Sequence, residues 1–298
     1  MTLICVFMPI EIGNSSGGPP ERQGPIAVTD SGAGGLSVLR ELLEVLPGEE
    51  FIYLADEGMM PYGDKPVHEI SQRTLQIARY FKGLQAKALV IACNTATAAG
   101  ADEVRNQYPN WPVVGIEPAV KPAAMMTRSG KVGILATSNT LASDRFKRLV
   151  SRFETVAEVR SQPCPGLVEL IENHPMDEKA IKLLMAPRIA DLLTAGADVL
   201  VLGCTHYPFV SKWIQELAGP DVQVIDTGLP VAKQVKARLE EVHLLNGAAS
   251  KKADSTCNKP CSRVRFLTTG SVPRLKSQLK YLLGPEWASS EVSSVVLV

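Results

Sequence analysis

A short stretch of the chain occurs twice, and this repeat restricts the fold more than any other feature. Residues 86–93 read Ala-Lys-Ala-Leu-Val-Ile-Ala-Cys and align without a gap with residues 197–204, Ala-Asp-Val-Leu-Val-Leu-Gly-Cys. In both copies a helical pattern leads into an apolar run, which ends in a small residue and a cysteine. A looser match joins residues 26–31 to residues 133–138. The repeat predicts two related halves, each with one cysteine after a buried strand.

Short apolar runs alternate with amphipathic stretches along the chain, which is typical of an α/β fold with mainly parallel sheets. We expect strands at residues 25–29, 51–54, 88–92, 113–116, 131–136, 199–203 and 222–225. We expect helices at residues 35–46, 69–84, 142–153, 177–194 and 230–241. The 298 residues are enough for two α/β domains or one large one. Because ligands bind at the carboxyl ends of parallel strands, halves that face each other would place Cys93 and Cys204 beside one cleft.

Composition and charge narrow the range of partners and locations. Lys plus Arg and Asp plus Glu both number 31, so the chain lacks the basic excess that nucleic acids and anionic membranes favour. No apolar run approaches the roughly 18–20 residues of a membrane span. Residues 1–24 hold an apolar segment without the basic region or cleavage site of a secretory signal, so we interpret them as a flexible leader. We expect a cytoplasmic protein that acts on a small molecule.

The six cysteines are more consistent with free thiols than with disulfides, because disulfide frameworks belong to short secreted chains. Cys257 and Cys261 have no second cysteine or histidine pair at ligand spacing, so we predict a loop there and no metal site.

Cys93 and Cys204 can be interpreted either as structural core residues or as functional thiols. A single cysteine after a buried strand is usually a small core residue. Asn94-Thr95 and Thr205-His206 directly follow the two cysteines, however, and a purely structural cysteine needs no such polar neighbours. The paired context favours a functional role for both thiols.

The residues alone leave other functions open. Glycines follow the first predicted strand, but Ser37 stands at the sixth place of the dinucleotide fingerprint, so that match is partial. A cysteine hydrolase would use Cys204 with His206 as its base and would leave Cys93 unexplained. The polar residues also have structural alternatives, since Asp30 could simply cap the helix that follows it.

Four motifs resemble those of the glutamate racemases, in the aspartate/glutamate racemase superfamily. They are Asp-Ser-Gly-Ala-Gly-Gly-Leu at residues 30–36, Pro-Tyr-Gly-Asp-Lys at 61–65, Cys-Asn-Thr-Ala at 93–96 and Gly-Cys-Thr-His-Tyr-Pro at 203–208. The resemblance runs from about residue 26 to residue 284 and leaves out residues 246–262, a polar insertion. It implies two pseudo-symmetric α/β domains with the active site in the cleft between them. Domain one would comprise residues 25–117 and 228–298, and domain two residues 118–227.

The resemblance also assigns roles to individual residues. Cys93 and Cys204 match the two acid/base thiols, and Glu172 matches a carboxylate that assists the second thiol. The positions that match substrate-binding or thiol-assisting residues are Asp30, Ser31, Tyr62, Gly63, Asn94, Thr95, Thr205 and His206. The chain departs from the family at residues 56–60, which usually read Asp-Thr and a basic residue, and at Glu169, which is often proline.

Racemisation gives both cysteines a chemical purpose. An α-proton leaves one face of the substrate and a proton returns on the other, so two groups must start in opposite protonation states. A free cysteine has a pKa near ~8.5, so about one-tenth is thiolate at pH ~7.5, at a cost of about 1.4 kcal/mol. We expect Asp30 to assist Cys93 and His206 to assist Cys204. Neutral donors that could bind the carboxylates of glutamate are Ser31, Asn94, Thr95, Thr137, Ser138 and Thr205, while Asp30 could accept from its ammonium group.

The function implied by the resemblance is racemisation of L-glutamate to D-glutamate for cell-wall peptidoglycan, without cofactor or metal. Cys93 would deprotonate D-glutamate and Cys204 L-glutamate. An aspartate or related racemase, a cysteine hydrolase and a non-catalytic binding protein are the alternatives. The sequence does not decide between a monomer and a homodimer.

Overall fold

The structure is a computed structural model that describes residues 23–173, 176–246 and 263–297. Its strands are β1 (Ile26–Asp30), β2 (Phe51–Ala55), β3 (Ala88–Ile91), β4 (Val113–Gly115), β5 (Lys131–Ala136), β6 (Glu158–Pro163), β7 (Val199–Leu202), β8 (Gln223–Ile225), β9 (Val264–Thr268) and β10 (Val292–Ser294). Its α-helices are α1 (Leu36–Val45), α2 (Val67–Gly83), α3 (Asn94–Gln107), α4 (Val120–Met126), α5 (Ser138–Ala142), α6 (Asp144–Ser151), α7 (Leu167–Glu172), α8 (Glu178–Thr194), α9 (Ser211–Ala218), α10 (Gly228–Glu241) and α11 (Val272–Leu282). Short 3-10 helices are η1 (Glu57–Met59), η2 (Tyr62–Asp64), η3 (Tyr207–Val210) and η5 (Pro285–Ser289).

The strands form two parallel sheets with a shared internal order. The six-stranded sheet runs β10-β9-β2-β1-β3-β4 and the four-stranded sheet runs β6-β5-β7-β8. Each strand of the series β2-β1-β3-β4 thus has a counterpart four places later in the second sheet. The sequence repeat maps onto β3 and β7, which precede Cys93 and Cys204. The predicted α/β fold with two pseudo-symmetric parallel sheets is confirmed.

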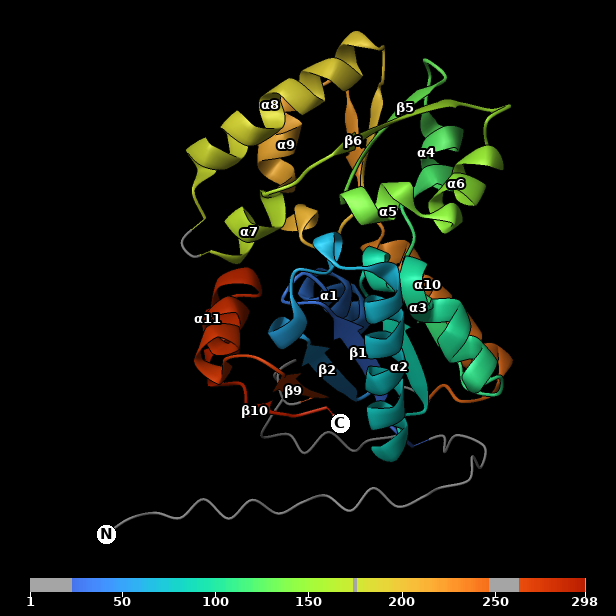
Figure 1. The fold of residues 1–298 in the computed structure, drawn as a ribbon, viewed down its shortest axis with the longest axis vertical. Coiled ribbons are helices and arrows are strands. Elements are labelled where there is room, and N and C mark those ends of the chain that lie inside the picture. The colour runs from blue at the N-terminus through green and yellow to red at the C-terminus, as the bar shows by residue number, and fades with distance from the viewer. Residues whose placement is uncertain (1–22, 174–175, 247–262, 298) are drawn as a thin grey trace.

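Helices cover both faces of each sheet (Figure 1). On the first sheet α1, α10 and α11 pack on one face, and α2 and α3 on the other. On the second sheet α7, α8 and α9 cover one face, and α4 and α6 the other. In β1, Ile26 and Val28 join one core while Ala27 joins the opposite core. Burial on both faces makes such strands continuously apolar, which explains why the sequence revealed them.

All seven predicted strands form within one residue of their predicted ends, and the five predicted helices within two. The strands β6, β9 and β10 were not predicted. Strand β6 is polar and mostly exposed at a sheet edge, so it lacks the apolar run that marks the buried strands. Helices α3, α4, α5, α7, α9 and α11 were also not predicted; α3 is rich in Ala, Thr and Gly and carries little apolar periodicity.

The first sheet takes its strands from residues 26–115 and 264–294, and the second from residues 131–225. The domain boundaries at residues 117/118 and 227/228 remain predictions. The leader up to residue 22, and Cys257 and Cys261 with the rest of residues 247–262, lie outside the described residues.

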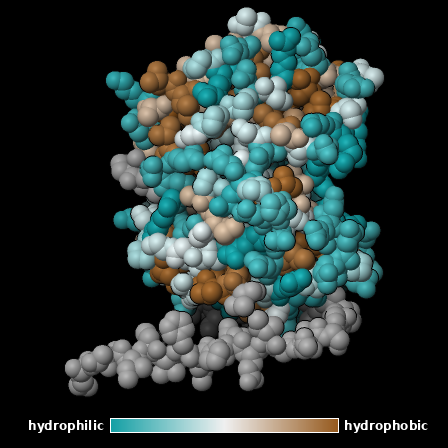
Figure 2. Space-filling model, viewed as in Figure 1, coloured by the Kyte–Doolittle hydropathy of each residue, from teal (hydrophilic) through white to brown (hydrophobic). Residues whose placement is uncertain are grey.

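The surface in Figure 2 is hydrophilic over most of the visible face, with hydrophobic residues in small separate patches. Within the described residues, no helix is both long and apolar enough to span a bilayer.

Candidate active site

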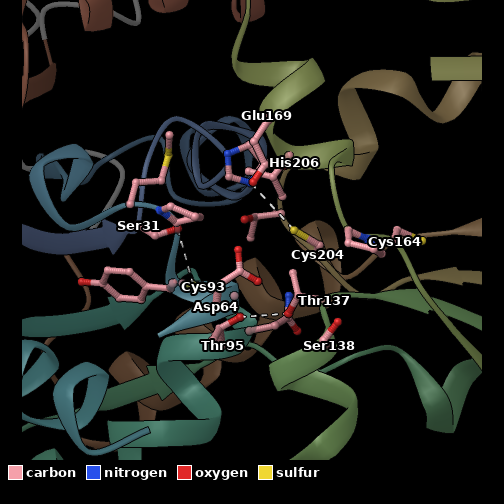
Figure 3. Close-up of a pocket in the computed structure, with 18 of the residues that line it drawn as sticks. Ser31, Asp64, Cys93, Thr95, Thr137, Ser138, Cys164, Glu169, Cys204 and His206 are labelled. Carbon is pink, nitrogen blue, oxygen red and sulfur yellow. Dashed lines mark hydrogen bonds between the residues drawn. The ribbon is translucent and has the colours of Figure 1, made fainter. Parts of the chain in front are cut away.

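A cavity of about 60 Å³ lies where the carboxyl ends of the two sheets meet (Figure 3). By the rule that one water needs about 10–15 Å³, it holds on the order of five waters, which suits a small molecule. Its lining comes from both halves and comprises Ser31, Met60, Pro61, Tyr62, Gly63, Asp64, Cys93, Asn94, Thr95, Thr137, Ser138, Cys164, Pro165, Gly166, Val168, Glu169, Cys204, Thr205 and His206. The structure therefore brings the two thiols of the sequence repeat to one cavity.

Cys93 lies between β3 and α3, where it is the N-cap residue of the helix. Its Sγ accepts a hydrogen bond from the Ala96 backbone N–H at 3.4 Å, and its thiol donates to Ser31 Oγ at 3.9 Å. Burial raises the pKa of the Cys93 thiol and the carboxylate of Asp30 adds to this, while the Ala96 N–H opposes it. The helix N-terminus and Ser31 are thus the groups that support a thiolate here.

Cys204 lies after β7 and has a titratable partner instead of a helix N-terminus. Its Sγ is 3.8 Å from Nδ1 of His206, and both residues are buried. The other ring nitrogen of His206, Nε2, is 2.7 Å from Oε1 of Glu172. The three side chains form a chain from thiol to imidazole to carboxylate; that His206 and Glu172 assist Cys204 remains a prediction.

The His206–Glu172 pair is an ion pair in a buried setting. Burial alone lowers the pKa of His206, but hydrogen bonds to Cys204 and Glu172 outweigh it and raise the pKa well above its usual value. For Glu172, burial raises the pKa, but the hydrogen bond and charge of His206, the Ala33 N–H and the charge of Arg274 together outweigh it, so the pKa falls to about 2. His206 is therefore held as an imidazolium, and its Nδ1 lies 3.8 Å from the Cys204 sulfur.

Close packing fixes the position of His206. A Cβ on Gly34 would lie 2.4 Å from His206 Nδ1, so only glycine fits at this point of the Gly-rich loop. The Ala33 backbone N–H in the same loop donates to Glu172 Oε1 at 3.0 Å. The first half of the chain thus packs around the imidazole that lies beside the thiol of the second half.

Asp30 and Glu172 lie behind the cavity rather than on its surface. Asp30 is 2% exposed, accepts from the Gly35 N–H at 2.9 Å and from Thr205 Oγ1 at 3.4 Å, and is absent from the cavity lining. Burial raises its pKa, and the charge of His206 opposes this. The roles of Asp30 in binding an ammonium group and in assisting Cys93 remain predictions.

All six of the predicted neutral donors line the cavity. Thr95 from the first half and Thr137 from the second are joined at 3.1 Å between their Oγ1 atoms (Figure 3), and Ser31, Ser138 and Thr205 also line the cavity. The side-chain amide of Asn94 is 5% exposed, and neither its nitrogen nor its oxygen has a hydrogen-bond partner in the described residues. A buried amide in this state is costly unless a ligand completes its bonds.

Tyr62 and Gly63 reach the cavity on the loop after β2. The Tyr62 hydroxyl donates to Asp56 Oδ2 at 2.5 Å, and the Arg73 guanidinium pairs with both oxygens of Asp56 at 2.7 and 2.9 Å. Asn139 donates its amide to the backbone oxygens of Tyr62 and Lys65, which ties the loop to the second half. A Cβ on Gly63 would meet the Thr137 side chain at ordinary van der Waals distance, 3.6 Å.

The sequence did not place Cys164, Pro165, Gly166 or Val168 in the cavity. They follow β6, the polar edge strand, and the Pro-Gly turn after a cysteine was the only available signal. The residues that hydrogen-bond to Asp56 and Glu172 were also missed, because they come from distant segments of the chain. Among the described residues, no group of three or more His, Cys, Asp or Glu side chains could hold a metal ion.

Comparisons with known proteins identify the family and the fold. Residues 26–235 match the family described as Asp/Glu/Hydantoin racemase. The chain is 48% identical to a glutamate racemase of Pseudomonas putida strain W619 over 262 residues, which are 86% of this chain and 99% of that protein. It is 51% identical to a glutamate racemase of Pseudomonas syringae pv. tomato over 226 residues, covering 76% of this chain and 82% of the other.

Two solved structures extend the similarity to the fold. A glutamate racemase from Bacillus anthracis matches with a TM-score of 0.81 and 30% identity, covering 93% of this chain and 99% of that one. The Escherichia coli glutamate racemase in complex with L-glutamate and activator UDP-MurNAc-ala matches with a TM-score of 0.76 and 27% identity, covering 92% and 99%. The chain is an amino-acid racemase, an isomerase, and it belongs to the Asp/Glu/Hydantoin racemase family together with the glutamate racemases.

Proposed function

We propose that the chain interconverts L- and D-glutamate by moving protons between the substrate's α-carbon and two thiols, Cys93 and Cys204. The observation that carries this proposal is the meeting of two buried thiols from different sheets at one small cavity. Inversion at carbon needs one acid/base group on each face, and a pair of such groups on facing domains supplies this.

The proton transfer balances without an outside reagent. The thiolate on one side takes the α-proton, so an S–H bond forms there as the C–H bond breaks. The carbanion then takes a proton from the thiol on the other side, where the S–H bond breaks. After one turnover the two cysteines have exchanged protonation states, and the opposite enantiomer restores them. By family resemblance we assign Cys93 to D-glutamate and Cys204 to L-glutamate.

The cavity lining supports binding of a carboxylate that gains charge in this step. Among the described lining residues there is no lysine or arginine. The unpartnered amide of Asn94 and the hydroxyls of Ser31, Thr95 and Thr205 provide neutral donors. Donors fixed in a dry site stabilise developing negative charge most effectively, since they need no reorganisation.

Glutamate is the substrate that the relatives favour. The Escherichia coli relative was solved with L-glutamate, and a Francisella tularensis glutamate racemase, 29% identical with a TM-score of 0.75, was solved with D-glutamate. We extend the proposal to supply of D-glutamate for peptidoglycan and to a cytoplasmic location. The free state of Cys93, Cys164 and Cys204 supports a reducing compartment.

The test is a racemisation assay on the purified chain with no pyridoxal phosphate and no added metal. L-Glutamate, D-glutamate and both aspartates are supplied separately, and the enantiomers are resolved by chiral chromatography. Glutamate should turn over much faster than aspartate, with equal kcat/KM in the two directions because the enantiomers have equal free energy. In D₂O, early product should carry deuterium while the remaining substrate does not.

Comparable turnover of aspartate would move the assignment to another racemase of the family. Early deuterium in both substrate and product would point to a single base that reaches both faces, against the two-thiol mechanism. Trapping of an acyl-enzyme on Cys204 would favour a hydrolase.

A further inference from the structure

The carboxylate of Glu172 accepts hydrogen bonds from helix α11, which has no direct part in the proposed reaction. Its Oε1 accepts from Ala33 and faces His206, and its Oε2 is left to two residues of α11. Arg274 Nη2 donates to Oε2 at 3.3 Å, and the Gln278 side-chain amide donates to the same oxygen. Figure 1 shows α11, from the C-terminal part of the chain, directly beside α7, which ends at Glu172.

Gln278 is unusual among the residues of its helix. It is 0% exposed, and its Oε1 has no hydrogen-bond partner in the described residues. Its buried neighbours on α11, Leu275 and Leu279, are apolar and pack in the core of the first half. An amide buried with one end unsatisfied is unfavourable for folding, so its presence is better explained by the bond that its other end makes to Glu172.

Arg274 separates Glu172 from a second buried acid. Its Nε lies 3.9 Å from Oε1 of Glu57, whose other oxygen accepts from Thr268 at 2.9 Å. The other titratable groups that affect Glu172, or are affected by it, are His206, Asp30 and Tyr53. Without the α11 donors, Oε2 would be a buried carboxylate oxygen with no hydrogen bond in the described residues.

We propose that Gln278, with Arg274, is a positioning residue for the Cys204 half of the reaction. It fixes the Glu172 carboxylate, which in turn orients His206 toward the Cys204 thiol. The C-terminal helix α11, which belongs to the first half of the fold, thereby controls the thiol of the second half. The inference rests on the proposed function for its kinetic readout, but the chain of contacts exists independently of it.

The first test compares three variants in the racemisation assay. Gln278→Leu removes the hydrogen-bond donor and keeps a similar side-chain volume. We expect kcat to fall about tenfold and KM to change less than about twofold, because a misplaced catalytic group slows the reaction more than it weakens substrate binding. Arg274→Gln, at a side chain that is 43% exposed and therefore tolerant of change, should lower kcat about threefold. The control Leu279→Val alters a buried residue of α11 that does not contact Glu172, and should lower stability while leaving kcat within about twofold.

The second test asks whether Gln278 acts through Glu172. In a Glu172→Gln background, adding Gln278→Leu should change kcat by less than about twofold, because interacting residues are not additive. A full tenfold loss in that background would overturn the proposal. So would a loss of kcat in Leu279→Val as large as that in Gln278→Leu, since it would show a purely structural role.

The third test does not depend on racemase activity. Iodoacetamide labelling, followed by mass spectrometry, gives the alkylation rates of Cys93 and Cys204 in one sample. In Gln278→Leu we expect Cys204 to react severalfold more slowly while Cys93 serves as the internal reference and keeps its rate. An equal change at both thiols, or at neither, would overturn the proposal. If wild type showed no racemisation, the proposed function would fail, and this labelling ratio would still decide the role of Gln278.

Discussion

Cys93 and Cys204 occupy equivalent places in two sheets of the same strand order, yet their surroundings differ in kind. Cys93 caps a 14-residue helix and relies on a backbone N–H and a serine hydroxyl. Cys204 precedes a short 3-10 helix and faces a buried His206–Glu172 ion pair. One half thus places fixed dipoles beside its thiol, and the other places a charged, titratable group there.

The difference shows how a repeated fold can serve a reaction that is not symmetric at each instant. At any moment one thiol must be ionised and the other protonated, so the two sites need comparable rather than identical support. A helix N-terminus keeps its partial charge at every pH, whereas His206 and Glu172 can lose theirs. The Cys204 half is therefore where pH and mutation of remote residues should act most strongly.

The largest expected effect is the loss of activity on replacing either thiol, and it should be similar for the two halves. Replacing Cys93 or Cys204 with serine should lower kcat/KM by roughly 10²–10⁴-fold in both directions, since an alcohol is a far weaker acid than a thiol. Kinetics with each enantiomer, and circular dichroism to verify the fold, provide the measurement. If the Cys204→Ser protein folded and kept most of its activity in both directions, the two-thiol mechanism would be wrong.

A second, smaller effect concerns the Cys204 half alone, where the free energy of unfolding should depend on pH through Glu172. The pKa of Glu172 is held at about 2 in the folded chain, against 4.5 ordinarily, because His206, the Ala33 N–H and Arg274 together outweigh the cost of burial. A lowered pKa stabilises the fold above about pH 4.5, and this contribution is lost as the pH falls toward 2. Glu172→Gln should therefore cost about 3 kcal/mol of unfolding free energy near neutrality, and the difference from wild type should shrink across that range.

Asp198 provides the matched control for Glu172. Its pKa is also lowered to about 2, by bonds to Thr127, Arg128 and Ser129 that outweigh desolvation, but it precedes β7 at the end away from the cavity. Asp198→Asn should lose acid-sensitive stability and keep its kcat, whereas Glu172→Gln should lose both. Urea unfolding at several pH values and racemisation assays give the two readouts. If both variants had the same kcat as wild type, Glu172 would have no role in catalysis at Cys204.

The smallest expected effect concerns the third thiol of the cavity. Cys164 follows β6, and burial raises its pKa to about 12, so it stays protonated near neutrality. Cys164→Ser makes the same chemical change as the two serine variants above and should alter kcat/KM by no more than about threefold, or under ~0.7 kcal/mol. A loss as large as that of Cys93→Ser would mean that the inversion uses a different pair of thiols.

The site was predictable from sequence where it consists of local motifs. Cys93-Asn94-Thr95 and Cys204-Thr205-His206 follow apolar strands, and a strand buried on both faces is marked by its composition. Strand β6 at a sheet edge has no such mark, so Cys164 and the turn after it were not placed in the cavity. Nothing in the sequence near Glu172 indicates Gln278, which lies 106 residues away.

The sequence by itself determined the α/β alternation, the repeat of β3 and β7, and the thiol at the end of each, because hydrophobic periodicity and strand-end motifs are local properties. The tertiary structure alone decided that Gly34 leaves room for His206, that Asp30 lies behind the cavity wall, and that α11 donates to Glu172. These contacts depend on how segments distant in the sequence pack against each other. Packing of this kind joins residues of any separation in the chain, and no local pattern records it.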